Sequence, residues 1–235
     1  MDYAVLDSIN LNSLYWIIFI GISLASWIVS SRLQNKFKKY SRVPVGLTGK
    51  QVAEKMLRDN GILDVKVTCT PGHLTDHYNP TTKTVNLSES VYSSASIAAA
   101  AVAAHECGHA VQHEKEYEPL RMRSALVPVV SFANKWVFWV ILLGMLMINT
   151  FPNLLLVGII LFGLTTLFSL VTLPVEINAS TRAVAWLEES GITNAQTTPM
   201  AIDALKSAAY TYVVAALASL ANLMYYILIF LRSRD

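Results

Sequence analysis

The stretch Ser96-Ile-Ala-Ala-Ala-Ala-Val-Ala-Ala-His105-Glu106-Cys107-Gly108-His109 decides the fold of this chain. Alanine is the strongest helix former, so residues 98–104 predict a helix, with an upstream serine as its N-cap. On such a helix His105 and His109 project from the same side and can bind one tetrahedral metal ion. Glu106 lies about 100 degrees around the helix from His105, where it can reach a water on that metal. The stretch therefore predicts a helix-borne zinc site with a general base.

Gly108 lies inside this predicted helix, where a glycine costs about 1 kcal/mol relative to alanine. It indicates that another part of the chain packs closely against the helix at this point. The alternative to a metal site is a surface helix with two unliganded histidines, because short motifs also occur by chance.

Composition predicts a membrane protein. Of the 235 residues, 54% are apolar and 14% are charged, whereas soluble domains carry about 25% charged residues. A bilayer is crossed by about 20 helical residues. Four apolar segments are long enough to do so, namely residues 14–30, 129–150, 154–173 and 209–231.

The flanks of the first apolar segment indicate its orientation. Asp2 and Asp7 precede the segment, and five basic residues follow it, namely Arg32, Lys36, Lys38, Lys39 and Arg42. By the positive-inside rule, the side that follows is cytoplasmic. No basic residues precede the segment and no small-residue cleavage site follows it, so we expect a retained anchor rather than a signal peptide. Four spans would place Arg232 and Arg234 outside, which conflicts with the same rule.

The polar segment between the first two spans predicts a small mixed domain. Thr48-Gly-Lys-Gln51 is a capping-box pattern that opens a helix, and Asn60-Gly61 closes it. Residues 65–70 alternate like a strand, and residues 73–87 predict two short strands joined at Asn79-Pro80. An exposed edge of this sheet could pair with an extended substrate. Alternatively, the strands only cover the metal helix.

A catalytic zinc takes three protein ligands, so one more donor is needed. The nearest candidates are His113, Glu114, Glu116 and Glu118. One straight helix cannot wrap three side chains around one ion, and this charge run is typical of a solvated helix end.

Glu176 is the better candidate for the third ligand. It follows the third apolar segment and lies beside Pro174, which we expect to reset the chain direction. A carboxylate at the mouth of a membrane helix is costly without a partner. The second and third spans lead out and back, so Glu176 returns to the side of His105. The alternative is that Glu176 pairs with Arg182 or caps a helix.

Three segments together resemble the YugP-type neutral zinc metallopeptidases of bacterial membranes: the motif at 105–109, Leu74-Thr-Asp-His-Tyr78, and Pro174-Val-Glu-Ile-Asn-Ala-Ser180. The likeness covers nearly the whole chain. More distantly, the arrangement is similar to the HtpX and CAAX-prenyl-protease group of gluzincins. In that group a Glu-x-x-Ala-Asp segment follows a transmembrane hairpin, its Glu binds zinc and its Asp supports a histidine ligand.

This resemblance implies that Glu176 binds zinc and that Ala179 matches the alanine of the segment. Ser180 stands where the distant group has aspartate. A serine can hydrogen-bond to an imidazole but cannot supply a negative charge. Asn178 or Asp76 are the residues that could compensate.

We therefore expect a mainly α-helical integral membrane protein with about four transmembrane helices and a small α+β, zincin-like cytoplasmic domain that carries the HExxH helix. The expected segments are an N-terminal anchor, the catalytic domain, a transmembrane hairpin, the third-ligand segment and a C-terminal transmembrane helix. Their ranges are 1–31, 32–125, 126–173, 174–208 and 209–235.

The expected function is that of a membrane-embedded zinc metallopeptidase of gluzincin type with one Zn²⁺ ion. A zinc-activated water would attack the peptide bond, with Glu106 as general base. His77 is the candidate second electrophile for the oxyanion, with Tyr78 or Arg182 behind it, although an isolated histidine can equally have a structural role. One alternative is a non-catalytic zinc-containing membrane scaffold or partner-binding protein. Another is a zinc hydrolase acting on a lipid or an isopeptide bond.

The expected partners are a peptide or membrane-protein substrate and the lipid bilayer. A homo-oligomer or a membrane-protein partner stays open. No nucleic-acid partner is expected, because the basic residues cluster at membrane edges and the net charge is only +2. Cys69 and Cys107 cannot form a disulfide framework, which favours a reducing compartment. On a regular helix Cys107 points away from the metal.

Overall fold

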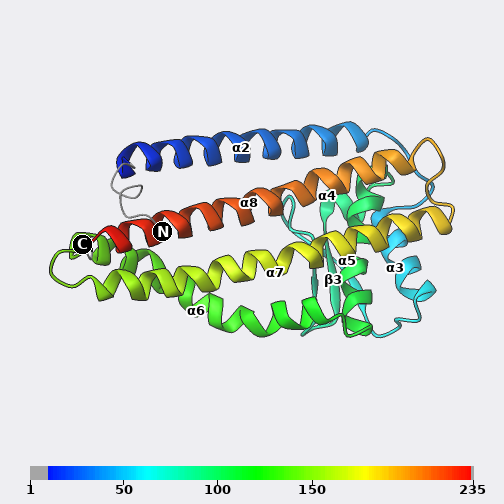
Figure 1. Ribbon diagram of the computed structural model, residues 1–235. Helices are drawn as coiled ribbons and strands as arrows, with labels where there is room; N and C mark the ends of the chain where they lie inside the picture. Colours follow the sequence, from blue (N-terminus) through cyan, green and yellow to red (C-terminus); the bar gives the residue numbers. More distant parts are fainter. Residues whose placement is uncertain (1–9, 234–235) are drawn as a thin grey trace. The chain divides into compact units, whose positions relative to one another are not determined.

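The computed structural model describes residues 10–233, and most of them are α-helical (Figure 1). A small three-stranded sheet and three shorter helices follow the first long helix. Asp2, Asp7 and Arg234, which entered the orientation argument, lie outside the described residues.

Three of the four apolar segments lie wholly in long helices, and the segment 129–150 is helical up to Leu146 and ends in a turn. The long helices are α2 (Leu11–Tyr40), α6 (Glu118–Leu146), α7 (Asn153–Glu189) and α8 (Thr198–Arg232). Each contains a window apolar enough to cross a membrane, and at most 28% of any window is buried within the structure. The remaining apolar surface suits contact with lipid, because helices satisfy their own backbone polar groups in hydrocarbon.

The helix α7 runs without interruption through Pro174. The expectation that this proline resets the chain is therefore wrong. A proline removes one backbone hydrogen bond from a helix. In α7 that loss falls beside well-packed turns, since Val175 and Ala179 are completely buried.

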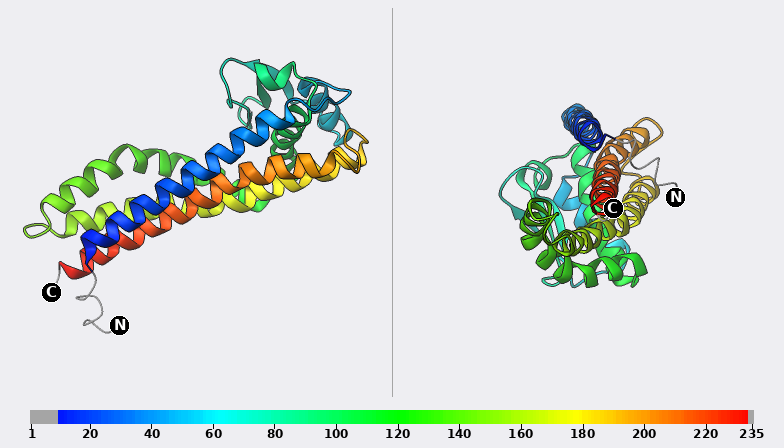
Figure 2. Two further views of the ribbon diagram at one scale, coloured as in Figure 1. Left: turned by 90° about the horizontal axis from the view of Figure 1, so that it is seen from above. Right: turned by 60° about the vertical axis from the view of Figure 1, so that its left-hand side comes forward.

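The chain divides into two compact units. The first comprises the chain up to Ile28, Met122–Leu173 and the part from Tyr212 onward. Within it, α6 and α7 form a hairpin, which both views of the molecule show (Figures 1 and 2). A Cβ atom on Gly144 would lie 2.6 Å from the Cα atom of Leu155, so only glycine permits this approach of the two backbones.

The second unit comprises Val29–Arg121 and Pro174–Thr211. Its short helices are α3 (Gly49–Asp59), α4 (Glu89–Tyr92) and α5 (Ile97–Glu114). Its strands are β1 (Lys66–Thr70), β2 (His77–Asn79) and β3 (Thr84–Ser88), in the order β1-β3-β2. Strand β3 pairs parallel with β1 and antiparallel with β2, so β2 is an edge strand.

The local patterns of the second unit are confirmed. The Thr48 side chain accepts a hydrogen bond from the Gln51 amide at 3.3 Å, and the Thr48 amide donates to the Gln51 side chain at 2.9 Å, which completes the capping box. The alanines of α5 form the centre of the core together with α3 and β3. Small side chains allow these elements to pack closely around the helix that carries the motif.

Candidate metal centre

Helix α5 positions His105 and His109 by burying its remaining faces. The hydroxyl of Ser96 accepts a hydrogen bond from the Ala99 amide and caps the helix start. Cys107 is completely buried, and its sulfur lies 3.5 Å from the Ala53 carbonyl oxygen. Burial raises the pKa of this thiol well above its ordinary value, so it is inert packing rather than a ligand.

Gly108 lets α7 approach this helix. A Cβ atom on Gly108 would lie 2.7 Å from the Ala179 carbonyl oxygen and 3.1 Å from the Ala179 Cα atom. The close packing that the sequence indicated at Gly108 is thus packing against α7. Glu176 lies about one turn before Ala179, so the same contact brings its carboxylate to the histidines.

The three predicted ligands meet in one cluster. Glu176 Oε2 lies 3.2 Å from His105 Nε2 and 3.6 Å from His109 Nε2, and the ligand atoms all lie within 4.8 Å of one another. A tetrahedral zinc with bonds of about 2.1 Å separates its ligand atoms by roughly 3.4 Å. The two distances from Glu176 bracket this value and the two imidazole nitrogens lie within 4.8 Å of each other, so small side-chain movements would let the donor set hold zinc.

Gln112 fixes the tautomer of His109. The Gln112 side-chain amide donates to the Val175 carbonyl oxygen at 2.8 Å and to Asn178 Oδ1 at 3.0 Å. Its Oε1 therefore faces His109 Nδ1, at 3.0 Å, and that nitrogen must be the donor. When His109 is neutral, the lone pair of its Nε2 then faces the Glu176 carboxylate 3.6 Å away. A proton or a metal ion between these two acceptor atoms relieves the contact.

The electrostatics of the site favour positive charge. Burial disfavours the charged imidazolium of His109, but the hydrogen bond to Glu176 and the nearby Glu106 charge outweigh it, so the pKa of His109 is raised. Both carboxylates are buried, at 8% exposure for Glu106 and 3% for Glu176. A negative potential that holds a proton on an imidazole also attracts a metal ion.

The partner of His105 is Ser180. Its hydroxyl lies 3.1 Å from His105 Nδ1, so serine does hydrogen-bond to the imidazole as the sequence allowed. Asn178 bonds to Gln112 and also accepts from Arg182 Nε at 2.7 Å, so it supports His109 only through Gln112. Asp76 instead accepts hydrogen bonds from the amide and hydroxyl of Ser88, near the end of β3.

Glu106 is held by the edge strand. The Tyr78 amide donates to Glu106 Oε2 at 3.0 Å. In an antiparallel pair the amide of every second residue points away from the partner strand. The free edge of β2 at Tyr78 therefore faces the side of α5 that carries Glu106, next to the two histidines.

The other predicted residues lie outside the cluster. His77 is exposed, with Nδ1 2.8 Å from the Thr75 carbonyl oxygen and Nε2 3.2 Å from Asn86 Nδ2. Its role at the oxyanion stays a prediction. His113 is exposed and lies 2.8 Å from the Tyr78 hydroxyl. Burial raises the pKa of Tyr78 to about 12, so this hydroxyl stays neutral and can donate to His113.

Sequence reasoning missed Gln112. It is completely buried, and it lies three residues after His109 and seven after His105. This spacing places it on the same face of the helix. A polar residue there, on an otherwise apolar helix interior, is the signal that could have identified it.

We expect Gln112→Leu to weaken zinc binding about 10- to 100-fold, because residues that orient a metal-bound histidine typically contribute that much. The leucine fills a similar volume but leaves the His109 Nδ1–H without its acceptor. Competition with a chromophoric zinc chelator measures the affinity. Gln196→Leu, which removes an exposed glutamine, is the matched control. An affinity within about twofold of the wild type for Gln112→Leu would contradict the role of this residue.

Comparison with known proteins gives two matches. The model of the family described as "Putative neutral zinc metallopeptidase" matches residues 15–231, a range that includes all three cluster residues. The Bacillus subtilis (strain 168) protein described as "Putative membrane protease YugP" is 42% identical over 217 residues, which cover 92% of this chain and 95% of that protein. No solved structure matches the chain.

Proposed function

The chain belongs to the neutral zinc metallopeptidase family, and from this premise we propose that it is a membrane zinc protease of gluzincin type. In this proposal His105, His109 and Glu176 hold one zinc ion. The observation that carries it is the convergence of two imidazole nitrogens and one carboxylate oxygen within 4.8 Å of one another.

The cluster supports a catalytic rather than a structural site. Within residues 10–233, the group of possible ligands contains three residues and no cysteine. Structural zinc sites are closed by four protein ligands and are commonly cysteine-rich, whereas catalytic sites keep one position open. This difference favours the protease over the alternative of a zinc-containing scaffold.

The proposed chemistry assigns the proton transfers to Glu106. Bound zinc would supply a Lewis acid and lower the pKa of a water molecule at the site. Glu106 would accept the proton of the attacking water and return it to the leaving amine nitrogen. Its hydrogen bond with the Tyr78 amide holds the carboxylate in one orientation, which supports this role. Ser180 and Gln112 would keep the two imidazoles aligned.

The proposed substrate is an extended peptide segment beside β2. Strand β2 is an edge of the sheet, and its Tyr78 amide is bonded to Glu106, so the outward Tyr78 carbonyl oxygen is the main-chain group offered to a peptide beside the catalytic glutamate. Main-chain hydrogen bonds to such an edge can position a peptide whatever its side chains are. The proposal includes His77 as a candidate for oxyanion stabilisation.

The proposed location of the site is the cytoplasmic side of the cell membrane. Residues 29–121 and 174–211 belong to one unit, although the second and third apolar segments separate them in the sequence. An out-and-back hairpin is consistent with this arrangement. The run of basic residues after the first span supports the cytoplasmic assignment by the positive-inside rule.

Zinc content and peptide hydrolysis together test the proposal. We expect the full chain, purified in detergent, to contain about one zinc per chain and to cleave members of a peptide library. Removal of the metal by a chelator should abolish cleavage, and added zinc should restore it. Zinc without cleavage of any peptide would favour the scaffold, and absence of zinc would refute the metal site itself.

A further inference from the structure

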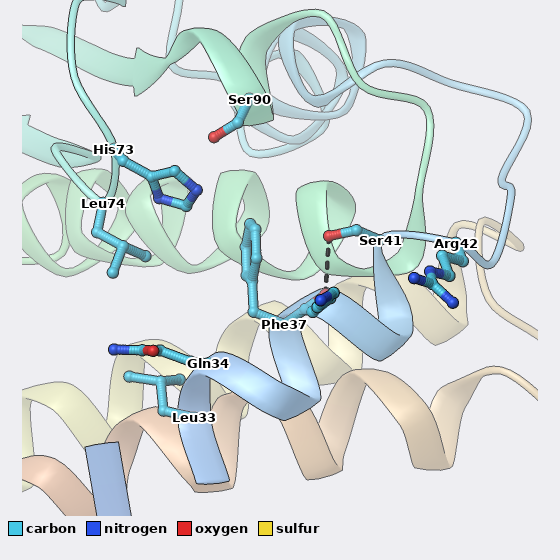
Figure 3. Close-up of a pocket in the computed structure, with 9 residues that line it drawn as sticks. Leu33, Gln34, Phe37, Ser41, Arg42, His73, Leu74 and Ser90 are labelled. Carbon is cyan, nitrogen blue, oxygen red and sulfur yellow. Dashed lines mark hydrogen bonds between the residues drawn. The ribbon is translucent and has the colours of Figure 1, made fainter. Parts of the chain in front are cut away.

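A cavity of the second unit lies along the end of α2, apart from the metal cluster. Its volume is about 690 Å³, within the range of small-molecule sites. Six residues form one wall, and His73, Leu74 and Ser90 contribute to the other (Figure 3). The six are Leu33, Gln34, Phe37, Lys38, Ser41 and Arg42. Leu33, the first residue of this wall, follows the first apolar segment by three residues on the same helix.

The wall formed by α2 and the turn after it changes from apolar to basic along the chain. Leu33 and Phe37 come first, and Lys38 and Arg42 follow, farther from the apolar segment. Leu33 and Lys38 are about 7 Å apart along a helix axis. Figure 3 shows Leu33 and Arg42 at opposite ends of this wall. A phospholipid has the same order, with its acyl chains toward the bilayer and its phosphate outward.

The two basic residues of this wall, Lys38 and Arg42, are available to a ligand. Their basic neighbours outside the cavity are engaged elsewhere: Lys36 is paired with Asp203, and the Lys39 ammonium lies 5.3 Å from the centre of the Tyr40 ring. Among the described residues, neither Lys38 nor Arg42 has an ion-pair partner. The cavity lining contributed by residues 10–233 contains no acidic side chain. The cavity therefore complements a negative charge.

Leu74 supplies a second, independent observation. It has φ +59°, a left-handed conformation that costs an L residue roughly 1 kcal/mol or more. Its apolar side chain is 55% exposed, so more than half of it is left uncovered by the described protein. Figure 3 shows Leu74 directed across the cavity toward Leu33 and Gln34. The backbone of Leu74 is strained although its apolar side chain stays exposed. This combination indicates that a ligand covers the side chain.

We propose that this cavity binds an anionic phospholipid drawn from the bilayer. The phosphate lies at Lys38 and Arg42, and the acyl chain contacts Leu33, Phe37 and Leu74. The site does not depend on zinc or on proteolysis, since no lining residue belongs to the metal cluster.

Native mass spectrometry of the full chain, released from lipid nanodiscs, tests the site. The discs contain phosphatidylcholine with a graded fraction of phosphatidylglycerol. We expect the wild type to retain phosphatidylglycerol selectively. The double variant Lys38→Gln/Arg42→Gln should bind it about 25-fold more weakly, because each basic residue near an anionic lipid contributes about fivefold.

The control Arg32→Gln/Lys39→Gln removes the same charge from the same stretch of chain but from residues outside the cavity, and should lose little selectivity. Leu74→Asn, which tolerates a positive φ, should also weaken retention of phosphatidylglycerol. Equal loss in the control pair, or unchanged retention in the Lys38→Gln/Arg42→Gln variant, would overturn the proposal. Displacement of the lipid by millimolar inorganic phosphate would show a free-phosphate site and would overturn it as well.

Discussion

Glu106→Gln is expected to leave zinc bound while peptide hydrolysis falls about 10²- to 10⁴-fold, the usual contribution of a general acid and base. Glutamine has the shape of glutamate but cannot accept the proton of the attacking water. Its side-chain oxygen can still accept the hydrogen bond that the Tyr78 amide donates at 3.0 Å, so the edge strand should keep its place. Zinc content and the rate of cleavage of one fluorogenic peptide, measured on the same preparation, separate the two effects.

Glu114→Gln is the matched control for this experiment. It makes the same chemical change at the exposed end of the same helix, away from the ligand cluster. We expect it to retain both zinc and activity. If Glu106→Gln kept more than about a tenth of the wild-type rate with zinc bound, another group would have to act as the base.

The parts of the site that could be predicted from the sequence are those governed by local rules. The alanine run and Ser96 fix where α5 begins, and helical periodicity then places His105 and His109 on one face. Glu176 could be found 67 residues farther along, because the hairpin of apolar segments returns the chain to the same side. The first step depends on the helical period and the second on the number of membrane spans. Both can be read directly from the sequence.

The parts that could not be predicted depend on tertiary contacts. Glu106 accepts its hydrogen bond from the backbone amide of Tyr78 in β2. Every residue except proline has such an amide, so the residue type at position 78 does not reveal the contact. The continuity of α7 through Pro174 depends on the burial of Val175 and Ala179, which outweighs the local effect of the proline. His77 has the right residue type and lies close in sequence to Tyr78, but its side chain bonds to Thr75 and Asn86.

The resemblance of the chain to a more distant group left the support of the histidines uncertain, because Ser180 replaces an acid there. The structure divides that support between two residues. Ser180 hydrogen-bonds to His105, and Gln112 hydrogen-bonds to His109. Both partners are neutral, so the negative charge near the imidazoles comes from Glu106 and Glu176 themselves. Loss of either neutral partner should therefore misalign an imidazole without changing the charge of the site.

Gly108→Ala is expected to damage both the fold and the metal site. An added Cβ would meet backbone atoms of Ala179 at 2.7 and 3.1 Å, and backbone cannot rotate away as a flexible side chain can. Overpacking of this kind costs about 1–3 kcal/mol or more, which exceeds the roughly 1 kcal/mol that alanine gains in helix propensity. To relieve the clash, α7 must shift away from α5, and Glu176 shifts with it.

We therefore expect Gly108→Ala to unfold at a temperature lower by several degrees and to lose most of its zinc. Thermal unfolding in detergent, with and without added zinc, and metal analysis of the purified protein measure the two effects. Gly163→Ala is the matched control, because Gly163 lies in α7 with nothing within 4 Å of an added Cβ. That variant should be at least as stable as the wild type and fully loaded with zinc. A Gly108→Ala protein with normal stability and one zinc per chain would show that the contact between α5 and α7 does not hold Glu176 in place.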